Sequence, residues 1–174
     1  FGMIAPDEET AAYLRGRHYA PKAEHWDLAM RHWQTFRTDE DAVFEREVEI
    51  DVREVRPQIT WGTSPQDVIA VDGLVPDPAA ASEGERRQAM RAALEYMGLV
   101  PGQPIAGTKI DWVFIGSCTN SRISDLRSAA KVVRGRTVAS HVRAWVVPGS
   151  QGVKRDAEAE GLDRVFREAG FEWR

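Results

Sequence analysis

The sequence predicts an α/β fold in which buried parallel strands alternate with helices. Two segments in the second half of the chain, residues 112–115 and 138–147, have strand-like patterns, and a helical pattern follows each of them. The first segment is a continuous apolar run, which is typical of a strand buried on both faces of a parallel sheet. Strands and helices that alternate in this way indicate βαβ units and a parallel sheet.

The first part of the chain contains two predicted helices and one predicted strand. The first helix follows Asp7, which can cap it, and the second begins near Lys22 and carries an apolar stripe at helical spacing. The stripe consists of Trp26, Ala29, Met30 and Trp33. Residues 44–52 alternate between apolar and acidic side chains, a pattern that predicts a half-exposed strand.

A change in composition toward Gly, Pro, Ser and Asp predicts a domain boundary in the middle of the chain. We expect residues 1–62 to end one α/β domain, residues 63–80 to be a linker, and residues 81–174 to begin a second domain. Ser82 and Glu85 have the spacing of a capping box, which predicts a helix from this point.

Two further helical regions follow the predicted strands. After the strand at 112–115, Asn120 or Ser121 can cap a helix that Gly135 ends, and the last helical region is interrupted at Gly161. Their apolar stripes are predicted to form core. The stripe residues are Ile123, Leu126, Ala130, Val133, Leu162, Val165, Phe166 and Ala169.

Composition excludes several classes of function. The chain has 174 residues, 43% of them hydrophobic and 29% charged, and its formal charge of −4 provides no basic surface for nucleic acid. No apolar run approaches the roughly 18 residues that a membrane span needs. A single cysteine excludes an intrachain disulfide framework and fits a reducing compartment, so we expect a cytoplasmic protein without nucleic-acid or membrane partners.

That cysteine, Cys118, lies in a polar turn between the predicted strand and the next helix. A lone cysteine is usually a small buried apolar residue, but this one is flanked by hydrogen-bonding side chains at a helix start, where the thiolate is favoured. A nucleophilic role would require a histidine base, and His141 is the plausible neighbour. An iron–sulfur cluster takes three or four cysteines, and the chain has one. The residues alone leave these alternatives open.

The sequence around Cys118 nevertheless resembles a known family. Phe-Ile-Gly-Ser-Cys-Thr-Asn-Ser-Arg-Ile at 114–123 is similar to the first cluster-cysteine motif of the aconitase superfamily, whose proteins carry a [4Fe–4S] centre. Other segments resemble one branch of that superfamily, the large subunits of isopropylmalate dehydratases. These segments are residues 2–8, 60–63, 147–150, 157–163 and 168–174. The resemblance implies a three-layer α/β/α aconitase-like fold.

The resemblance also implies an activity and a site. It implies a hydro-lyase of leucine biosynthesis that interconverts 2- and 3-isopropylmalate by removing and re-adding water. Three cysteines of the family hold three irons, and the fourth iron acts as a Lewis acid on the substrate. By resemblance Cys118 is one of these metal ligands. Ser117, Thr119, Asn120 and Arg122 match the same motif and are implied to surround the cluster or the substrate.

Other parts of the family's site have no counterpart in this sequence. The second and third cysteines, a Cys-x-x-Cys pair, are expected beyond Arg174, the substrate-binding Asn and Glu before Phe1, and a serine base in a separate small subunit. We therefore expect a middle segment of a large subunit that is inactive and binds no cluster by itself. The alternatives are a homoaconitase-type hydro-lyase, a non-catalytic α/β binding module, and an enzyme with a cysteine nucleophile.

Overall fold

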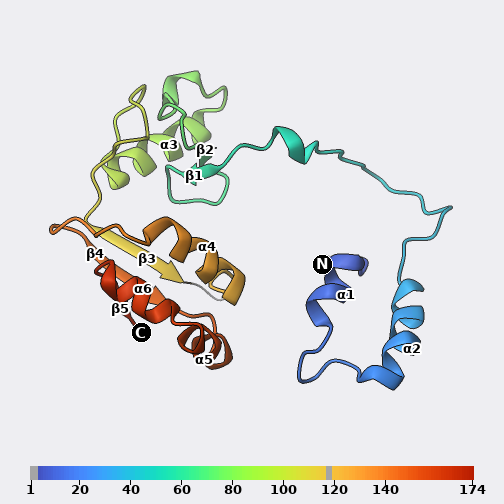
Figure 1. Cartoon of the computed structure of the whole chain (residues 1–174). Helices are drawn as coiled ribbons and strands as arrows, with labels where there is room; N and C mark the ends of the chain where they lie inside the picture. The colour runs from blue at the N-terminus through green and yellow to red at the C-terminus, as the bar shows by residue number, and fades with distance from the viewer. Residues whose placement is uncertain (1–3, 117–118) are drawn as a thin grey trace. The chain divides into compact units, whose positions relative to one another are not determined.

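The structure is a computed structural model that describes residues 4–116 and 119–174. It divides the chain into two compact units, Phe1–Glu54 and Val55–Arg174, whose elements are labelled in Figure 1. The predicted linker at 63–80 lies inside the second unit. The division of the chain into two aconitase-like domains at that linker stays a prediction.

The first unit contains the two predicted helices, α1 (Glu8–Leu14) and α2 (Ala23–Gln34). Asp7 caps α1, since its carboxylate accepts hydrogen bonds from the Thr10 amide at 2.8 Å and the Thr10 hydroxyl at 2.6 Å. These bonds, with the hydroxyl the larger cause, hold the pKa of Asp7 below its usual value. Both helix predictions are confirmed.

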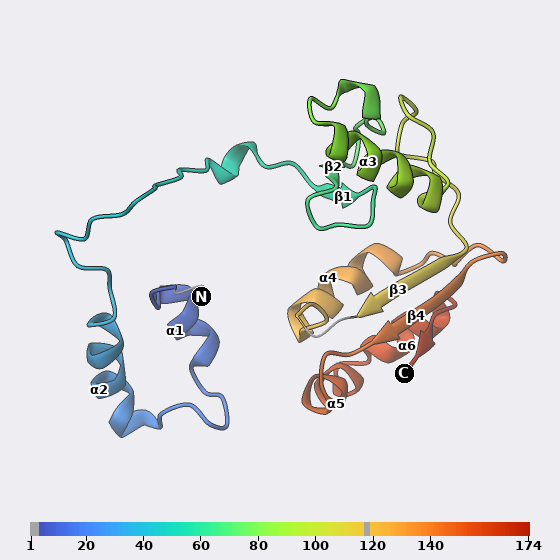
Figure 2. The same ribbon diagram turned by 180° about the vertical axis from the view of Figure 1, so that it is seen from behind.

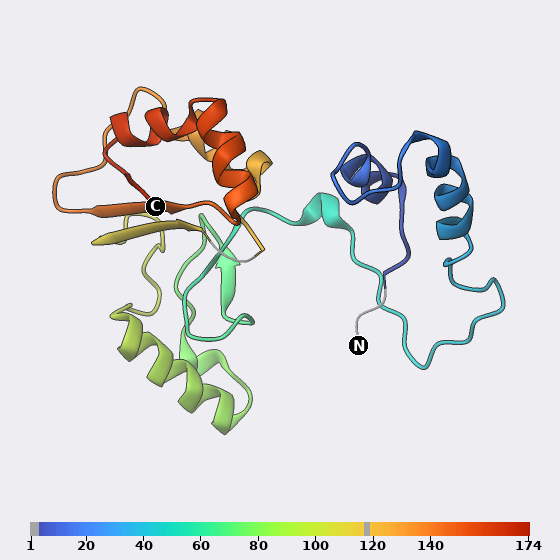
Figure 3. The same cartoon turned by 90° about the horizontal axis from the view of Figure 1, so that it is seen from below.

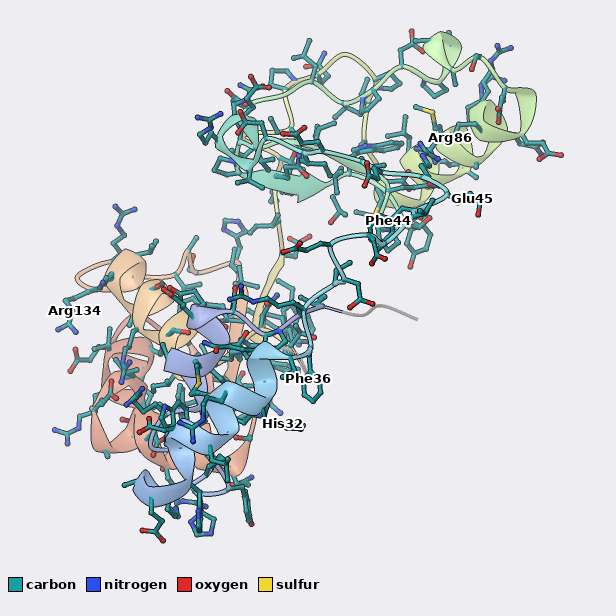
Figure 4. The ribbon with its side chains drawn as sticks, turned by 90° about the vertical axis from the view of Figure 1, so that its right-hand side faces the viewer. His32, Phe36, Phe44, Glu45, Arg86 and Arg134 are labelled. Carbon is teal, nitrogen blue, oxygen red and sulfur yellow. The ribbon has the colours of Figure 1, made fainter. Side chains whose placement is uncertain are left out.

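The apolar stripe of α2 is only partly buried. Trp26 is buried and packs edge to face on Trp33, with ring centroids 5.8 Å apart. At the end of α2 the ring of His32 packs edge to face on Phe36, just beyond the helix, with ring centroids 4.9 Å apart; both side chains are labelled in Figure 4. Since Phe36 is itself exposed, this end of α2 contributes little to a core.

The strand predicted at 44–52 is wrong. Residues 44–51 form neither strand nor helix, and the short 3₁₀ helix η1 (Val52–Glu54) follows them. Val48 and Ile50, on the apolar side of the alternation, are 68% and 69% exposed. The physical reason is that no strand among the described residues pairs with this segment, so its backbone groups remain available to water.

The second unit begins with a small antiparallel hairpin and the helix α3. The elements are β1 (Gln58–Thr60), β2 (Val68–Ala70), η2 (Pro78–Ala80) and α3 (Gly84–Met97). The helix is confirmed, but the capping box is wrong: α3 begins at Gly84, so Glu83 occupies the N-cap and makes no side-chain cap hydrogen bond. Ser82 therefore lies one residue too early to cap it.

A partly buried ion pair joins the hairpin loop to α3. The carboxylate of Asp67, 3% exposed, accepts a hydrogen bond from the Arg86 guanidinium at 2.7 Å and from the Ser64 amide at 3.1 Å. Arg86 is labelled in Figure 4. This part of the second unit has its own apolar core, formed by Trp61, Val75, Met90, Ala93, Leu94 and Ile105.

The rest of the second unit is a three-stranded parallel sheet with the order β3-β4-β5. Its strands are β3 (Trp112–Gly116), β4 (Arg143–Val147) and β5 (Glu172–Trp173). Its helices are α4 (Ile123–Val133), α5 (Gln151–Ala159) and α6 (Leu162–Glu168). The three helices lie on the same side of the sheet, as the edge-on view in Figure 3 shows, and Figure 2 shows β3 and β4 side by side. The predicted α/β class and parallel βαβ connections are confirmed.

The core of this layer lies between the helices and one face of the sheet. Leu126, Val146 and Phe166 are fully buried there. On the opposite face Trp112 and Phe114 are 47% and 56% exposed, so the prediction that β3 is buried on both faces is wrong for this chain. The reason is that α4, α5 and α6 all pack on the same face.

The strand predicted from 138 begins only at Arg143, because a turn between Ala139 and Val142 precedes it.

Candidate functional site

The turn between β3 and α4 contains every site residue that the sequence predicted. Ser117 and Cys118 lie outside the described residues, and Thr119, Asn120, Ser121 and Arg122 form its described part. Thr119, Asn120 and Arg122 are exposed, whereas Ser121 is buried. Because β3 is a parallel strand and α4 begins directly after the turn, these residues stand at the carboxyl edge of the sheet, where α/β proteins bind ligands.

The cap of α4 differs from the prediction. Arg122, and neither Asn120 nor Ser121, is the N-cap, because Arg122 has the extended backbone that a cap requires. Its backbone amide donates a hydrogen bond to the Asp125 carboxylate at 3.0 Å. Asp125 therefore complements the positive end of the helix dipole.

Ser121 is an unusual residue in this turn. Its φ is +73°, in the left-handed region that a serine seldom occupies, and it is 2% exposed. Its hydroxyl has no hydrogen-bond partner among the described residues. Its carbonyl accepts a hydrogen bond from the amide of Gly149 at 3.0 Å. The local sequence indicates Ser121 only as a possible cap, because Gly149 lies far along the chain.

The second turn at this edge joins β4 to α5. It runs through Pro148 and Gly149 to Ser150, whose hydroxyl accepts a hydrogen bond from the Val153 amide at 3.2 Å and caps α5. Since β3 and β4 are parallel neighbours, the starts of α4 and α5 lie at the same edge of the sheet. Two helix starts at one edge direct the positive ends of their dipoles to the same region, which favours a negatively charged ligand there.

Away from the turns, an ion pair links α4 to the end of α5. The Arg127 guanidinium donates two hydrogen bonds to the Glu160 carboxylate, at 2.8 and 2.6 Å. These hydrogen bonds hold the pKa of Glu160 below its usual value.

His141 is exposed, and no described contact joins it to the turn after β3. The described residues also contain no group of three His, Cys, Asp or Glu that could hold a metal ion.

Comparison with known proteins defines the class. The sequence profile of the Aconitase family (aconitate hydratase) matches residues 1–174, so the chain belongs to the aconitase family. Over 173 residues, 99% of the chain, it is 65% identical to the 3-isopropylmalate dehydratase large subunit 1 of Bradyrhizobium diazoefficiens and covers 36% of that protein. Over the same share it is 60% identical to the 3-isopropylmalate dehydratase large subunit of Cupriavidus necator and covers 65% of it. The chain thus spans less than two thirds of either relative.

Membership in this family implies a [4Fe–4S] cluster in full-length proteins. The chain supplies one cysteine thiol, which could bind one iron of such a cluster. The described residues of its turn are polar and lie at the edge of the sheet where α4 and α5 begin. The chain does not supply ligands for the whole cluster, because three or four thiolates are needed.

Of the helices in the described part of the chain, none has the length and apolar character to cross a membrane.

Proposed function

We propose that this chain is the part of an isopropylmalate dehydratase large subunit that carries the first cluster-ligand turn. The whole protein would interconvert 2- and 3-isopropylmalate by removal and re-addition of water, with a small subunit as its partner. One observation carries this proposal: the apolar strand, polar turn and helix around Cys118 lie within a region that is 60–65% identical to two proteins named for that activity.

In this proposal Cys118 is a thiolate ligand of one iron, and the nearby start of α4 favours its deprotonated form. The cluster or the substrate is lined by Ser117, Thr119, Asn120 and Arg122. The hydroxyl, amide and guanidinium groups of these residues can donate hydrogen bonds to the carboxylates of the substrate. When bound, the cluster supplies a Lewis acid that stabilises the departing hydroxide. The cytoplasmic location stays a prediction.

Replacement of the thiol tests the proposal. In the complete enzyme, with both subunits, Cys118→Ser is expected to lower iron content and to reduce turnover of isopropylmalate by several orders of magnitude, about what the loss of a Lewis acid causes. Iron is measured by chemical analysis, and turnover by absorbance of the unsaturated intermediate.

Ser128→Ala is the matched control for this experiment. Ser128 is exposed on α4, and its hydroxyl donates to the Ser124 carbonyl of the same helix, at 3.0 Å. Retention of both iron and activity in Cys118→Ser would refute the assignment of Cys118. If the complete enzyme turned over a homologous tricarboxylate but not isopropylmalate, the homoaconitase-type alternative would replace the proposed substrate.

A further inference from the structure

We propose that the loop between α1 and α2 forms a binding site for a small dianion that carries its charge on oxygen atoms, either a phosphate group or a dicarboxylate. The loop joins the two helices of the first unit in Figure 1 and lines a cavity of about 350 Å³. A cavity of this volume suits a small ligand. The site goes beyond the proposed function, because it uses no residue of the turn after β3.

The first observation is an excess of positive charge around the cavity. Arg15, Arg17 and Lys22 line it, and Asp27 is the one carboxylate among the described residues that do so. Throughout the described residues, no ion pair joins any of the three cations to a carboxylate. The excess is local, since the whole chain has a formal charge of −4. Three cations and one carboxylate leave two positive charges, which a dianion balances.

Described contacts hold these cations in place without neutralising them. The Arg15 guanidinium lies over the ring of Trp26, 4.7 Å from its centroid. The Arg17 guanidinium lies 3.6 Å from the ring centroid of Tyr13, and its Nε donates to the Tyr13 carbonyl at 2.7 Å. The Lys22 ammonium donates to a backbone carbonyl of the same loop at 3.1 Å. Rings and carbonyls orient a cation but carry no full negative charge, so the cations are preorganised for an anion.

The second observation is a buried donor without an acceptor. Trp26 lines the cavity and is 6% exposed. Its indole N–H is buried and has no hydrogen-bond partner among the described residues. Helical side chains lean toward the N-terminal turn, so Trp26 leans toward the first turn of α2, where Ala23 also lines the cavity. A buried N–H without an acceptor costs free energy, and an oxygen of a bound anion would remove that cost.

The third observation is the start of α2 itself. Pro21, Lys22 and Ala23 line the cavity, and the twelve-residue helix begins at Ala23. Lys22 is its N-cap and makes no side-chain cap hydrogen bond. The positive end of the helix dipole therefore lies at the wall of the cavity, a position that favours an anion. The free cations, the indole N–H and the helix start all favour the same ligand chemistry.

Titration of the 174-residue chain with inorganic phosphate, followed by NMR of the indole N–H signals, tests the site directly. The chain has six tryptophans, and Trp26→Phe identifies the Trp26 signal as the one that disappears. Phosphate is expected to shift that signal with saturation and to leave the other five nearly unchanged. Succinate serves as the second probe. A saturable shift with either probe supports the site, and the probe that binds more tightly identifies the source of the dianion.

No shift of the Trp26 signal with either probe up to about 10 mM, above the millimolar range of a weak specific site, would refute the proposal. Equal shifts of all six indole signals would also refute it, because they would show a general effect of the added salt. Circular dichroism of the titrated sample checks that the chain stays folded.

Variants of the lining residues sharpen the test, with affinity measured by calorimetry. Arg15→Gln and Lys22→Gln should each weaken binding of the tighter probe about tenfold, the effect of losing a hydrogen bond between charged groups. Trp26→Phe keeps a ring and removes the N–H, and should weaken it about fivefold. If Arg15→Gln, which loses its contact with the Trp26 ring, does not fold, Lys22→Gln decides.

Arg31→Gln is the matched control for the charge variants. Arg31 is exposed on the same helix and does not line the cavity, so its replacement removes an equal charge and should leave the affinity unchanged. If Arg31→Gln weakens binding as much as Lys22→Gln does, the attraction depends on net charge alone and the site is refuted. Unchanged affinity in Trp26→Phe would likewise contradict the role of the indole N–H on which the proposal depends.

Discussion

Residues 44–52 and strand β4 are both predicted to be strands and have opposite outcomes. Residues 44–52 alternate between apolar and acidic side chains, whereas β4 is apolar from Ala144 to Val147. In β4 two of these side chains, Ala144 and Val146, lie inside the core. In residues 44–52 the apolar side chains remain mostly exposed. Alternation therefore indicates that a segment could form a strand, but it does not provide the neighbouring strand with which that segment would pair.

The physical difference is the number of neighbours. β4 pairs with β3 on one side and β5 on the other, so both sets of its backbone groups find partners. Helices α4, α5 and α6 then cover its buried side chains. Residues 44–52 have neither a pairing strand nor a helix layer among the described residues, and without burial nothing offsets the entropy of ordering them.

The largest expected contrast comes from two phenylalanines. Phe166→Ala removes a fully buried ring and should lower the free energy of unfolding by about 3–5 kcal/mol. Phe44→Ala, at a residue that is 54% exposed, should change it by no more than about 0.5 kcal/mol. Urea unfolding followed by circular dichroism measures both values. A loss of similar size in Phe44→Ala would mean that residues 44–52 pack in solution.

Two valines give a smaller and chemically matched contrast. Val146→Ala in β4 should cost about 2 kcal/mol of unfolding free energy, because it removes buried methyl groups and leaves a cavity. Val48→Ala, at an exposed residue, should cost less than about 0.5 kcal/mol. The same urea titration measures both changes in unfolding free energy. Equal effects of the two substitutions would show that Val48 is buried in solution as Val146 is, contrary to the comparison above.

The smallest effect concerns pH. Arg127 lowers the pKa of Glu160 in the folded protein, so the ion pair stabilises the fold above the unfolded pKa of about 4.3. That stabilisation is lost as the pH falls through the lower, folded pKa. Urea midpoints between about pH 6 and pH 3 should therefore drop slightly more in the wild type than in Glu160→Gln. Parallel curves would show that the pair contributes nothing to stability.

Much of the candidate site was predictable, because its signals are local. The apolar run, the glycine, the polar turn and the helical stripe after it lie within a few residues of one another, and the structure has β3 and α4 where they predict them. The cap was not predictable: Ser121 has the better side chain for it, but its backbone lies in the left-handed region, and its carbonyl accepts a hydrogen bond from Gly149, a residue far along the chain.

The sequence by itself determined the positions of the helices, the parallel βαβ order and the family. Helical periodicity and capping are properties of neighbouring residues, and they need no knowledge of the fold. Only the tertiary structure decided which face of β3 is covered, why residues 44–52 do not pair, and that the turns after β3 and β4 meet at Ser121. Each of these depends on residues far apart in the chain, whose approach is set by sheet register and packing and not by local pattern.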